Sequence, residues 1–366
     1  MAKAKYIMIG GFLGAGKTTA VLALARRLRD AGQRAGLITN DQSFGLVDTT
    51  MLQSNGFNVE EIGGGCFCCR FSSLVEASEN LSREGRPDAF IAEPVGSCTD
   101  LRAAVSYPLR KIYGDDFEVA PLSVLVDPVR AERMLGLAEG RAFAPKVTYV
   151  YDKQLEEADA IILNKTDLLD AERLERLRSA VASRYPQARL FSVSARSGVG
   201  LDEWFEYVLN AEGGLQDSPD VDYEIYAEGE ALLGWLNCTV NVSATSEFDG
   251  NAFLMSLATR IRSSMETGEI AHLKMTLSPD EGNDLAVLNL VRNDGAAELS
   301  HQLQAPVENG ELIVNLRAEE DPEQLWNRLQ ESLSATAAEF GATTKVEQHE
   351  FFRPSKPNPT HRLAFA

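Results

Sequence analysis

The stretch that decides the fold is Gly11-Phe12-Leu13-Gly14-Ala15-Gly16-Lys17-Thr18, which Thr19 follows. It matches the phosphate-binding pattern G-x-x-x-x-G-K-[ST] in every fixed position. A buried-strand pattern at Tyr6–Ile9 precedes it, and an amphipathic helix is expected at Lys17–Leu28. Glycines let such a loop turn its backbone N–H groups around phosphate oxygens, and the helix start adds its dipole. The alternative is a glycine-rich turn without a ligand.

The same loop predicts a role for each of its residues. Lys17 would reach the β- and γ-phosphates of a nucleotide, and the Thr18 hydroxyl would bind Mg²⁺. The residues expected to hold the nucleotide here are Gly11, Gly14, Ala15, Gly16, Lys17, Thr18 and Thr19.

Strand-like and helix-like segments alternate over residues 1–210. Strands are expected at Ala35–Thr39, Phe57–Ile62, Ala89–Ala92, Leu122–Val126, Ala160–Leu163 and Leu190–Val193. Helices are expected at Leu74–Arg83, Leu101–Tyr113, Ala171–Arg184 and Leu201–Leu209, the second of them broken by Pro108. This alternation predicts a P-loop α/β domain whose mostly parallel sheet is covered on both faces.

The pattern changes after residues 211–220, a small, polar and helix-breaking segment that we interpret as a linker. Residues 221–353 follow the order of a smaller ferredoxin-like α+β domain. Its strands are expected at Trp235–Val242, Ala271–Thr276, Leu285–Val291, Leu312–Leu316 and Thr343–Phe352, and its helices at Ala252–Ser264 and Pro322–Phe340. The tail 354–366 contains three prolines and is expected to be loosely ordered.

Charge separates the same two regions. The 366 residues carry 35 basic and 54 acidic side chains, for a net charge of −19. Residues 1–210 have 25 basic against 28 acidic side chains, whereas residues 211–366 have 10 against 26. So acidic a chain is a poor candidate for nucleic-acid binding, because nucleic acid is itself a polyanion.

The five cysteines are Cys66, Cys68, Cys69, Cys98 and Cys238. An odd number, with three of them within four residues, does not fit a disulfide framework. The chain shows no secretory signal and no apolar run of the roughly 18 to 20 residues that span a bilayer. The sequence thus favours the reducing cytoplasm, with no membrane partner.

A second motif indicates which base the nucleotide carries. Asn164-Lys165-Thr166-Asp167 follows the strand expected at Ala160–Leu163. The Asp167 carboxylate can accept hydrogen bonds from the N1–H and exocyclic amine of guanine, which adenine cannot match. Ser194 and Ala195, at the end of the next strand, are similar to the loop that caps guanine in GTPases. The sequence therefore favours GTP over ATP.

Two carboxylates follow strands that end at the phosphate edge of the sheet. Asp41 comes after the strand Ala35–Thr39, and Glu93 comes after Ala89–Ala92. One or both are expected to hold Mg²⁺ through water and to orient the attacking water, together with Lys17. Alternatively, either residue caps the helix that follows it.

The segment Gly63-Gly64-Gly65-Cys66-Phe67-Cys68-Cys69 is the most unusual in the chain. Thiolates suit Zn²⁺ and other late transition metals, and the C-x-x-C spacing of Cys66 and Cys69 brings two sulfurs to one ion. Cys68 supplies a third sulfur, which leaves one coordination position open for transfer. A closed structural zinc site, a redox pair and buried packing are the alternatives. Cys98 could complete the shell but is more simply a packing residue, and Cys238 is expected in the core.

These motifs, in this order, resemble the CobW family of P-loop GTPases, whose relatives insert nickel during hydrogenase and urease maturation. The resemblance covers residues 5–210. It departs from the family at Asp41, where the family usually has Glu, and at Glu93-Pro94-Val95-Gly96, which is closer to the hydrogenase-maturation branch.

The resemblance implies a GTP-hydrolysing metallochaperone or metal-cofactor insertase that uses GTP/GDP, Mg²⁺ and Zn²⁺, or Co²⁺ in place of zinc. Its partner would be a client metalloprotein or a cobalamin-dependent enzyme, and it could form a homo-oligomer. Residues 41–48 would sense the γ-phosphate. A GTP-switched scaffold or activator of such an enzyme is the alternative, and a small-molecule P-loop kinase is a third.

Overall fold

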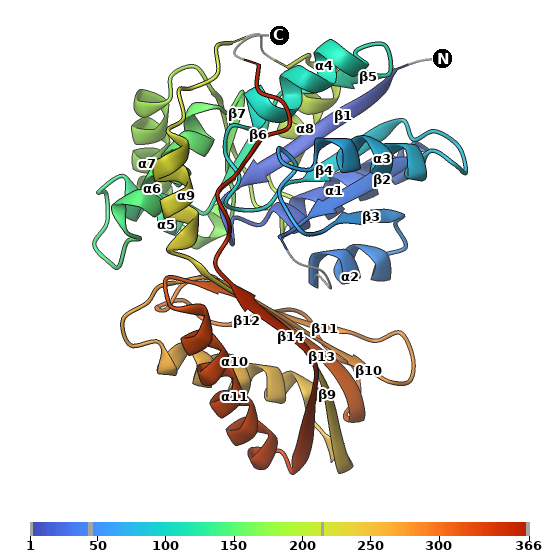
Figure 1. The fold of residues 1–366 in the computed structure, drawn as a ribbon, viewed down its shortest axis with the longest axis vertical. Helices are drawn as coiled ribbons and strands as arrows, with labels where there is room; N and C mark the ends of the chain where they lie inside the picture. The colour runs from blue at the N-terminus through green and yellow to red at the C-terminus, as the bar shows by residue number, and fades with distance from the viewer. Residues whose placement is uncertain (1–2, 43–46, 214–215, 364–366) are drawn as a thin grey trace. The chain divides into compact units, whose positions relative to one another are not determined.

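The computed structural model describes residues 3–42, 47–213 and 216–363 of the chain, and these form two compact units (Figure 1). The first unit is drawn from Met1–Phe44, Asn55–Gly229 and Lys356–Ala366, and the second from Gly45–Ser54 and Glu230–Ser355. The second unit thus takes a short segment from the first part of the chain, and the first unit takes the C-terminal segment. This division follows the contacts between residues. The domain ranges expected from the sequence remain a prediction.

Parallel strands form the sheet of the first unit, in the order β3-β2-β4-β1-β6-β7-β8, with β5 paired to β1. All of these pairs are parallel. The strands are β1 (Ala4–Gly11), β2 (Ala35–Asn40), β3 (Val59–Ile62), β4 (Ala89–Glu93), β5 (Phe117–Val119), β6 (Ser123–Val126), β7 (Ala160–Leu163) and β8 (Arg189–Ser192). The central position of β1 puts the P-loop in the middle of the sheet's carboxyl edge, where α/β proteins bind ligands.

Helices connect these strands. They are α1 (Lys17–Asp30), α3 (Phe71–Leu81), η1 (Arg102–Ser106), α4 (Tyr107–Tyr113), α5 (Pro128–Met134), α6 (Pro145–Glu156), η2 (Thr166–Leu168), α7 (Ala171–Arg184), α8 (Leu201–Asn210) and α9 (Tyr223–Ala231), which extends into the second unit. In α1, buried Val21, Leu24 and Leu28 recur at helical spacing, which places one apolar stripe against the sheet. The α/β fold class expected from the sequence is confirmed.

The second unit is an antiparallel sheet in the order β12-β11-β10-β13-β9-β14. Its elements are β9 (Gly234–Phe248), α10 (Gly250–Ser264), β10 (Ile270–Pro279), β11 (Ala286–Leu290), β12 (Glu298–His301), β13 (Val307–Ala318), α11 (Pro322–Glu339) and β14 (Ala342–Phe352). Strand β13 lies between β9 and β10, and β9 lies between β13 and β14. This is the ferredoxin-like arrangement that the sequence predicts, extended at one edge by β11 and β12.

Helix α2 (Val47–Ser54) belongs to the second unit although it follows β2 in sequence. Val47 packs in a buried cluster with Leu285, Val287 and Ile313. The Val47 backbone N–H donates to Asn315 Oδ1 at 3.1 Å. The chain thus leaves the first unit after β2, adds one helix to the second, and returns.

Several elements differ from the sequence-based expectation. Helices α2, α5, α6 and α9 and strands β5 and β12 were not expected. The helix expected at Leu101–Tyr113 is a π-helix, η1, that continues into α4 with Pro108 in the first turn of α4. A proline removes a helical N–H and crowds the carbonyl four residues earlier, and the wider π-turn accommodates both effects.

The expectation of a loosely ordered tail is wrong for residues 356–363, which hydrogen-bond to the first unit. Among the described residues, no helix has the length and apolar character that crossing a membrane requires.

Candidate nucleotide and metal site

The P-loop has the backbone that its glycines allow. Gly11 and Gly16 have φ of 129° and 93°, in the region that other residues rarely adopt. A Cβ on Gly11 would lie 2.3 Å from the carbonyl oxygen of Leu125, and one on Gly16 would lie 2.4 Å from Nδ2 of Asn164. Both glycines are therefore required by the close approach of β6 and of the loop after β7.

Lys17 and Thr18, the first residues of α1, meet Glu93 at the end of β4. The Thr18 hydroxyl donates to Glu93 Oε1 at 3.0 Å, and Lys17 Nζ lies 3.9 Å from the same oxygen. All three side chains are buried. A hydroxyl beside a carboxylate is a set of hard oxygen ligands of the kind that Mg²⁺ prefers, so these residues fit the ion that the motif implies.

Asn164 joins the P-loop to the loops expected around the base. Its Nδ2 donates to the Ala15 carbonyl at 2.9 Å, and its Oδ1 accepts from the Ala195 N–H at 2.9 Å. Beside it, the backbone N–H and the hydroxyl of Thr166 both donate to the Val193 carbonyl, each at 3.1 Å. The two loops after β7 and β8 are thereby locked to one another and to the phosphate loop.

A partly buried ion pair that the sequence did not reveal supports the same loop. Lys165 Nζ donates to the Gly14 carbonyl at 2.7 Å and to Asp127 Oδ2 at 2.8 Å. Asp127 caps α5 by accepting from the Arg130 N–H at 3.0 Å, and Arg130 also donates to the Leu13 carbonyl. Burial alone would raise the pKa of Asp127, but the cations of Lys165 and Arg130 lower it to about 2. An Asp-Pro pair directly after an apolar strand was the available signal of this helix start.

The other residues expected to contact the nucleotide differ in their exposure to solvent. Asp167 is exposed in η2, while Ser194 and Ala195 are buried. Asp41 directly follows β2, is partly buried, and donates its backbone N–H to the Ile62 carbonyl at 3.2 Å. Half of the loop expected to sense the γ-phosphate, residues 43–46 of 41–48, lies outside the described residues. The functional roles of these residues stay predictions.

Asn40, the last residue of β2, holds the cysteine loop and was also missed. Its Nδ2 donates to the carbonyls of Ile62 and Gly65 at 2.8 and 2.7 Å, and its Oδ1 accepts from the Phe67 N–H at 3.0 Å. The Asn40 side chain is buried, so these bonds replace contacts with water. An asparagine where a buried strand ends was the only local signal.

Cys66, Cys68 and Cys69 come together as the spacing predicts. The Cys66 sulfur lies 2.8 Å from that of Cys68 and 3.3 Å from that of Cys69, and the last two are 3.7 Å apart. Four thiolates around one tetrahedral zinc ion would be roughly 3.8 Å apart, given a Zn–S bond near 2.3 Å. All three cysteines are free thiols, so a small outward adjustment would admit one ion.

Hydrogen bonding among these thiols favours ionisation of Cys66 over that of its neighbours. Hydrogen bonds from Cys68, Cys69 and Cys98 hold the pKa of Cys66 well below its usual value. The hydrogen bond with Cys66 raises the pKa of Cys69 to about 11. Cys98 is buried beside the cluster and contacts both Cys66 and Cys68, whereas Cys238 lies in β9 of the second unit. A lowered thiol pKa favours the thiolate form, which is the form that binds metal.

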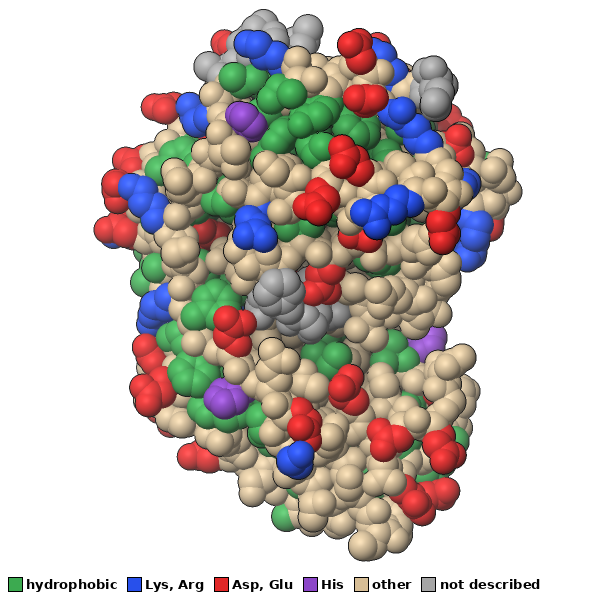
Figure 2. All heavy atoms as spheres, turned by 45° about the vertical axis from the view of Figure 1, so that its right-hand side comes forward, with side chains coloured by type: hydrophobic (Ala, Val, Ile, Leu, Met, Phe, Trp, Pro, Cys, Tyr) green, Lys and Arg blue, Asp and Glu red, His purple; other side chains and the backbone are tan. Residues whose placement is uncertain are grey.

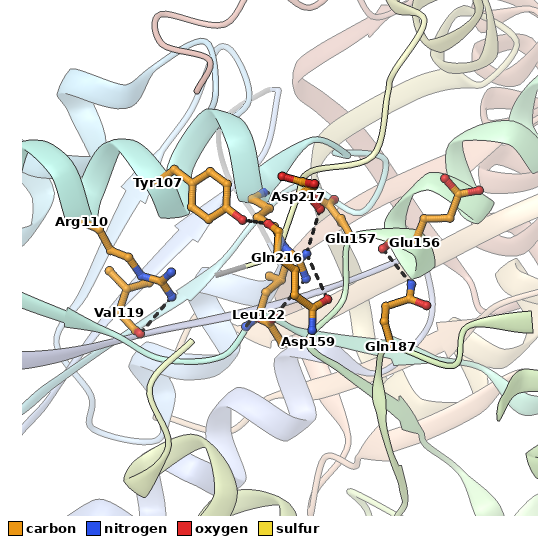
Figure 3. Close-up of polar contacts among 11 residues, drawn as sticks. Tyr107, Arg110, Val119, Leu122, Glu156, Glu157, Asp159, Gln187, Gln216 and Asp217 are labelled. Atoms are coloured by element: carbon orange, nitrogen blue, oxygen red, sulfur yellow. Dashed lines mark hydrogen bonds and ion pairs between the residues drawn. The ribbon is translucent and has the colours of Figure 1, made fainter. Parts of the chain in front are cut away.

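Buried charges fix the chain that runs past Cys98 into η1. Arg102 donates to Asp159 Oδ1 at 2.9 Å, and the Arg102 N–H donates to Glu157 Oε2 at 2.9 Å. Asp159 also accepts from the Leu122 N–H at 2.8 Å, and Tyr107 donates to the Gln216 carbonyl (Figure 3). Burial raises the pKa of Glu157 to about 8. The network ties part of the expected linker to the first unit.

A doubly wound parallel sheet with a P-loop after its central strand defines a P-loop nucleotide-binding protein. Residues 5–192 match the family described as "CobW/HypB/UreG, nucleotide-binding domain". The chain belongs to this family.

Three known proteins show the similarity in more detail. The chain is 31% identical over 196 residues to the "Zinc chaperone CobW" of a Sinorhizobium species, covering 48% of this chain and 55% of that protein. It is 31% identical over 166 residues to the "Zinc chaperone YeiR" of Escherichia coli K12, covering 44% and 46%. The crystal structure of Zn(II)-bound YjiA GTPase from E. coli covers 90% of this chain and 99% of that chain, at 15% identity and a TM-score of 0.36. The chain spans about half the length of these curated relatives.

Proposed function

We propose that the protein is a Mg²⁺-dependent GTPase that couples its nucleotide state to the binding and transfer of a transition metal, of the zinc or cobalt class, at Cys66, Cys68 and Cys69. Family membership supports the nucleotide half of this proposal. The zinc-chaperone names of two relatives and the cysteine cluster support the metal half. Free thiols favour a reducing compartment, so we place the protein in the cytoplasm.

The nucleotide half relies on positioning. The P-loop N–H groups and Lys17 would hold the phosphates, Asp167 would read the guanine edge, and Asp41 or Glu93 would orient the attacking water. Mg²⁺, held through Thr18 and Glu93, would neutralise charge on the phosphate oxygens. The cradle is already formed, because Asn164 and Lys165 hold the carbonyls of Ala15 and Gly14.

The observation that carries the coupling is the bonding of Asn40. This residue ends β2 immediately before Asp41, the first residue of the expected sensing loop. Its amide makes one hydrogen bond to the end of β3 and two to the cysteine loop that follows. A nucleotide-dependent movement of Asp41 would therefore act on the support of the cysteines. Any such coupling is reciprocal: metal changes GTP affinity by the factor by which GTP changes metal affinity.

The metal half relies on an incomplete shell. Three sulfurs leave one tetrahedral position open to a water, to Cys98 or to a ligand from a client protein. An open position allows a client ligand to bind before the chain releases the ion, which suits transfer better than permanent storage.

The test is a triple variant with Cys66, Cys68 and Cys69 replaced by alanine. It should lose tight Zn²⁺ or Co²⁺ binding and keep GTP binding, whereas the control Cys238→Ala in the second unit should keep both. Titrating zinc with GTP, with GDP and without nucleotide then gives the coupling factor. Unchanged metal stoichiometry in the triple variant contradicts the proposal.

A second candidate function is that of a GTP-switched scaffold or activator of a cobalamin-dependent enzyme or another metalloenzyme. It is favoured by the acidic C-terminal region, whose residues 211–366 carry 26 acidic and 10 basic side chains. Figure 2 shows acidic side chains spread over the visible surface of the second unit, with few basic ones between them. Client capture that depends on GTP and survives loss of the three cysteines would identify this function. A preference for ATP over GTP would instead indicate a kinase.

A further inference from the structure

The C-terminal segment of residues 356–363, which we call the strap, lies on the cysteine loop of the first unit. The Asn358 N–H donates to Cys69 Sγ at 3.2 Å. The Thr360 N–H donates to the Cys68 carbonyl at 2.9 Å, and the Thr360 hydroxyl donates to the Cys69 carbonyl at 3.2 Å. The first of these bonds is made to one of the three sulfurs that would hold the metal ion. In Figure 1 the strap is the red trace that continues beyond β14 to the C-terminal label.

The far end of the strap is fixed by a buried carboxylate. Arg362 Nε donates to Asp100 Oδ2 at 2.7 Å, and Tyr223 donates to the same oxygen at 2.5 Å. The Leu363 N–H donates to the Ala103 carbonyl at 2.9 Å. The Asp100 side chain is fully buried and the residue has φ of 65°, uncommon for a residue other than glycine. Because a buried charge is costly without a partner, Asp100 favours occupation of this surface by a cation.

The sequence of the strap suits an extended, exchangeable segment. Pro357 and Pro359 flank Asn358 and have no backbone N–H. Residues 357–360 therefore have two N–H donors, at 358 and 360, and both bind the cysteine loop. Prolines also restrict the free segment to extended conformations, which lowers the entropy lost on docking. His361 meets the edge of Phe71, the first residue of α3, with ring centroids 5.0 Å apart.

The strap lies beside the most exposed cysteine of the cluster. Cys66 and Cys68 are 4% and 1% exposed, whereas Cys69 is the partly exposed member. The strap donates to the sulfur of Cys69, so it covers the side of the cluster that is nearest to solvent.

We propose that the carbonyls of Cys68, Cys69 and Ala103 and the Asp100 carboxylate form a peptide-docking surface whose occupant is the strap, and that release of the strap opens Cys69 for metal transfer. This inference rests on the proposed metal site. The surface fits an extended peptide with free N–H groups at alternate positions and an arginine beyond them. An acceptor protein that presents such a segment would displace the strap as it takes the ion.

Zinc release from the full chain into excess chelator tests the proposal. Arg362→Ala and Asn358→Pro, which removes the N–H donor to Cys69, should each release zinc on the order of ten-fold faster than wild type. Asn358→Ala keeps the N–H and should match wild type. Arg353→Ala, which removes an arginine that bonds within the second unit, should also match it.

A synthetic peptide of residues 353–363 gives a second measurement. Added in excess to Arg362→Ala, it should restore slow release, and the same peptide with alanine at position 362 should not. Equal release rates in wild type and both strap variants, at full zinc stoichiometry, would contradict the role of the strap. They would leave the proposed metal site unaffected. A wild-type chain that binds no zinc overturns the metal site and the strap with it.

Discussion

The side-chain oxygen of Asn40 accepts a hydrogen bond from the backbone N–H of Phe67 at 3.0 Å. The residue that ends β2 thus holds the centre of the cysteine motif, 27 positions further along the chain. Parallel strands β2 and β3 are neighbours, so the segments that follow them emerge side by side at the same sheet edge. Asn40 therefore joins two segments: the one that begins with Asp41, which is expected to respond to the nucleotide, and the loop that carries the cysteines.

Replacing Asn40 with alanine should weaken both the fold and the metal site. Two carbonyls and one N–H lose a buried partner, so we expect the free energy of unfolding to fall by about 2 kcal/mol. Loss of a group that orients a ligand loop typically weakens metal binding, here by roughly ten-fold. Chemical denaturation and zinc competition measure the two effects. The control is Asn210→Ala, whose exposed side chain donates to the Glu206 carbonyl at the end of α8; equal zinc affinity in both variants would contradict the assigned role of Asn40.

Much of this site could be predicted from the sequence, because the P-loop and Asn164–Asp167 are local motifs whose geometry their own residues fix. The supporting residues could not. Asn40, Asp127 and Arg130 act through contacts with segments distant in sequence, and each by itself is an ordinary strand end or helix start. A single sequence gives the type of residue at such a place but not the partner that the fold brings to it.

Glu93→Gln should separate GTP binding from hydrolysis. The amide keeps the size of the side chain and an acceptor for the Thr18 hydroxyl, but it removes the negative charge beside Lys17. We expect Mg²⁺-dependent hydrolysis to fall on the order of a hundred-fold, with GTP affinity changed by a few-fold. Phosphate release and nucleotide titration measure the two quantities. Glu118→Gln, which removes the negative charge that pairs with Lys5, is the matched control on β5, and a loss of equal size there would refute the role of Glu93.

Glu157 should make stability depend on pH in the neutral range. Burial raises its pKa in the folded chain to about 8. An unfolded glutamate has a pKa near 4.3, so the folded chain holds a proton that the unfolded chain has lost. The stabilisation is complete below about pH 4 and is lost as pH rises towards 8, by at most about 1.4 kcal/mol per pH unit.

Glu157→Gln keeps the neutral form at every pH, so its unfolding midpoint should fall less than that of wild type between about pH 6 and 8. Thermal unfolding followed by circular dichroism measures the difference. The neighbouring Glu156 is partly exposed and pairs with Lys153, so Glu156→Gln should keep the pH profile of wild type. Parallel profiles for wild type and Glu157→Gln would show that Glu157 is ionised in the folded chain.

The fold could be predicted to a similar extent. Its prediction failed for a similar reason, namely contacts with segments distant in sequence. Alternation of strands and helices indicated the parallel sheet, and the order of elements after residue 220 indicated the ferredoxin-like unit. The short segment Val47–Ser54 carries no local sign that it packs in the second unit. The strap contains two prolines, Pro357 and Pro359, which favour irregular structure whether or not the segment is bound. Both placements depend on surfaces that other parts of the chain supply.

The docking of α2 in the second unit leads to a last prediction. Asn315 accepts the Val47 N–H at the start of this helix, and Lys274 pairs with Asp48. Asn315→Ala should therefore lower the hydrogen-exchange protection of residues 47–54 by roughly ten-fold. The expected sensing loop, residues 41–48, includes the first two residues of α2. The rate of GTP hydrolysis should therefore also change by several-fold, although Asn315 lies in β13 of the second unit. Asn289→Ala removes an asparagine that bonds Ser300 in the same sheet and should leave both quantities at their wild-type values. Faster exchange with an unchanged rate would mean that α2 is anchored here without acting on the nucleotide.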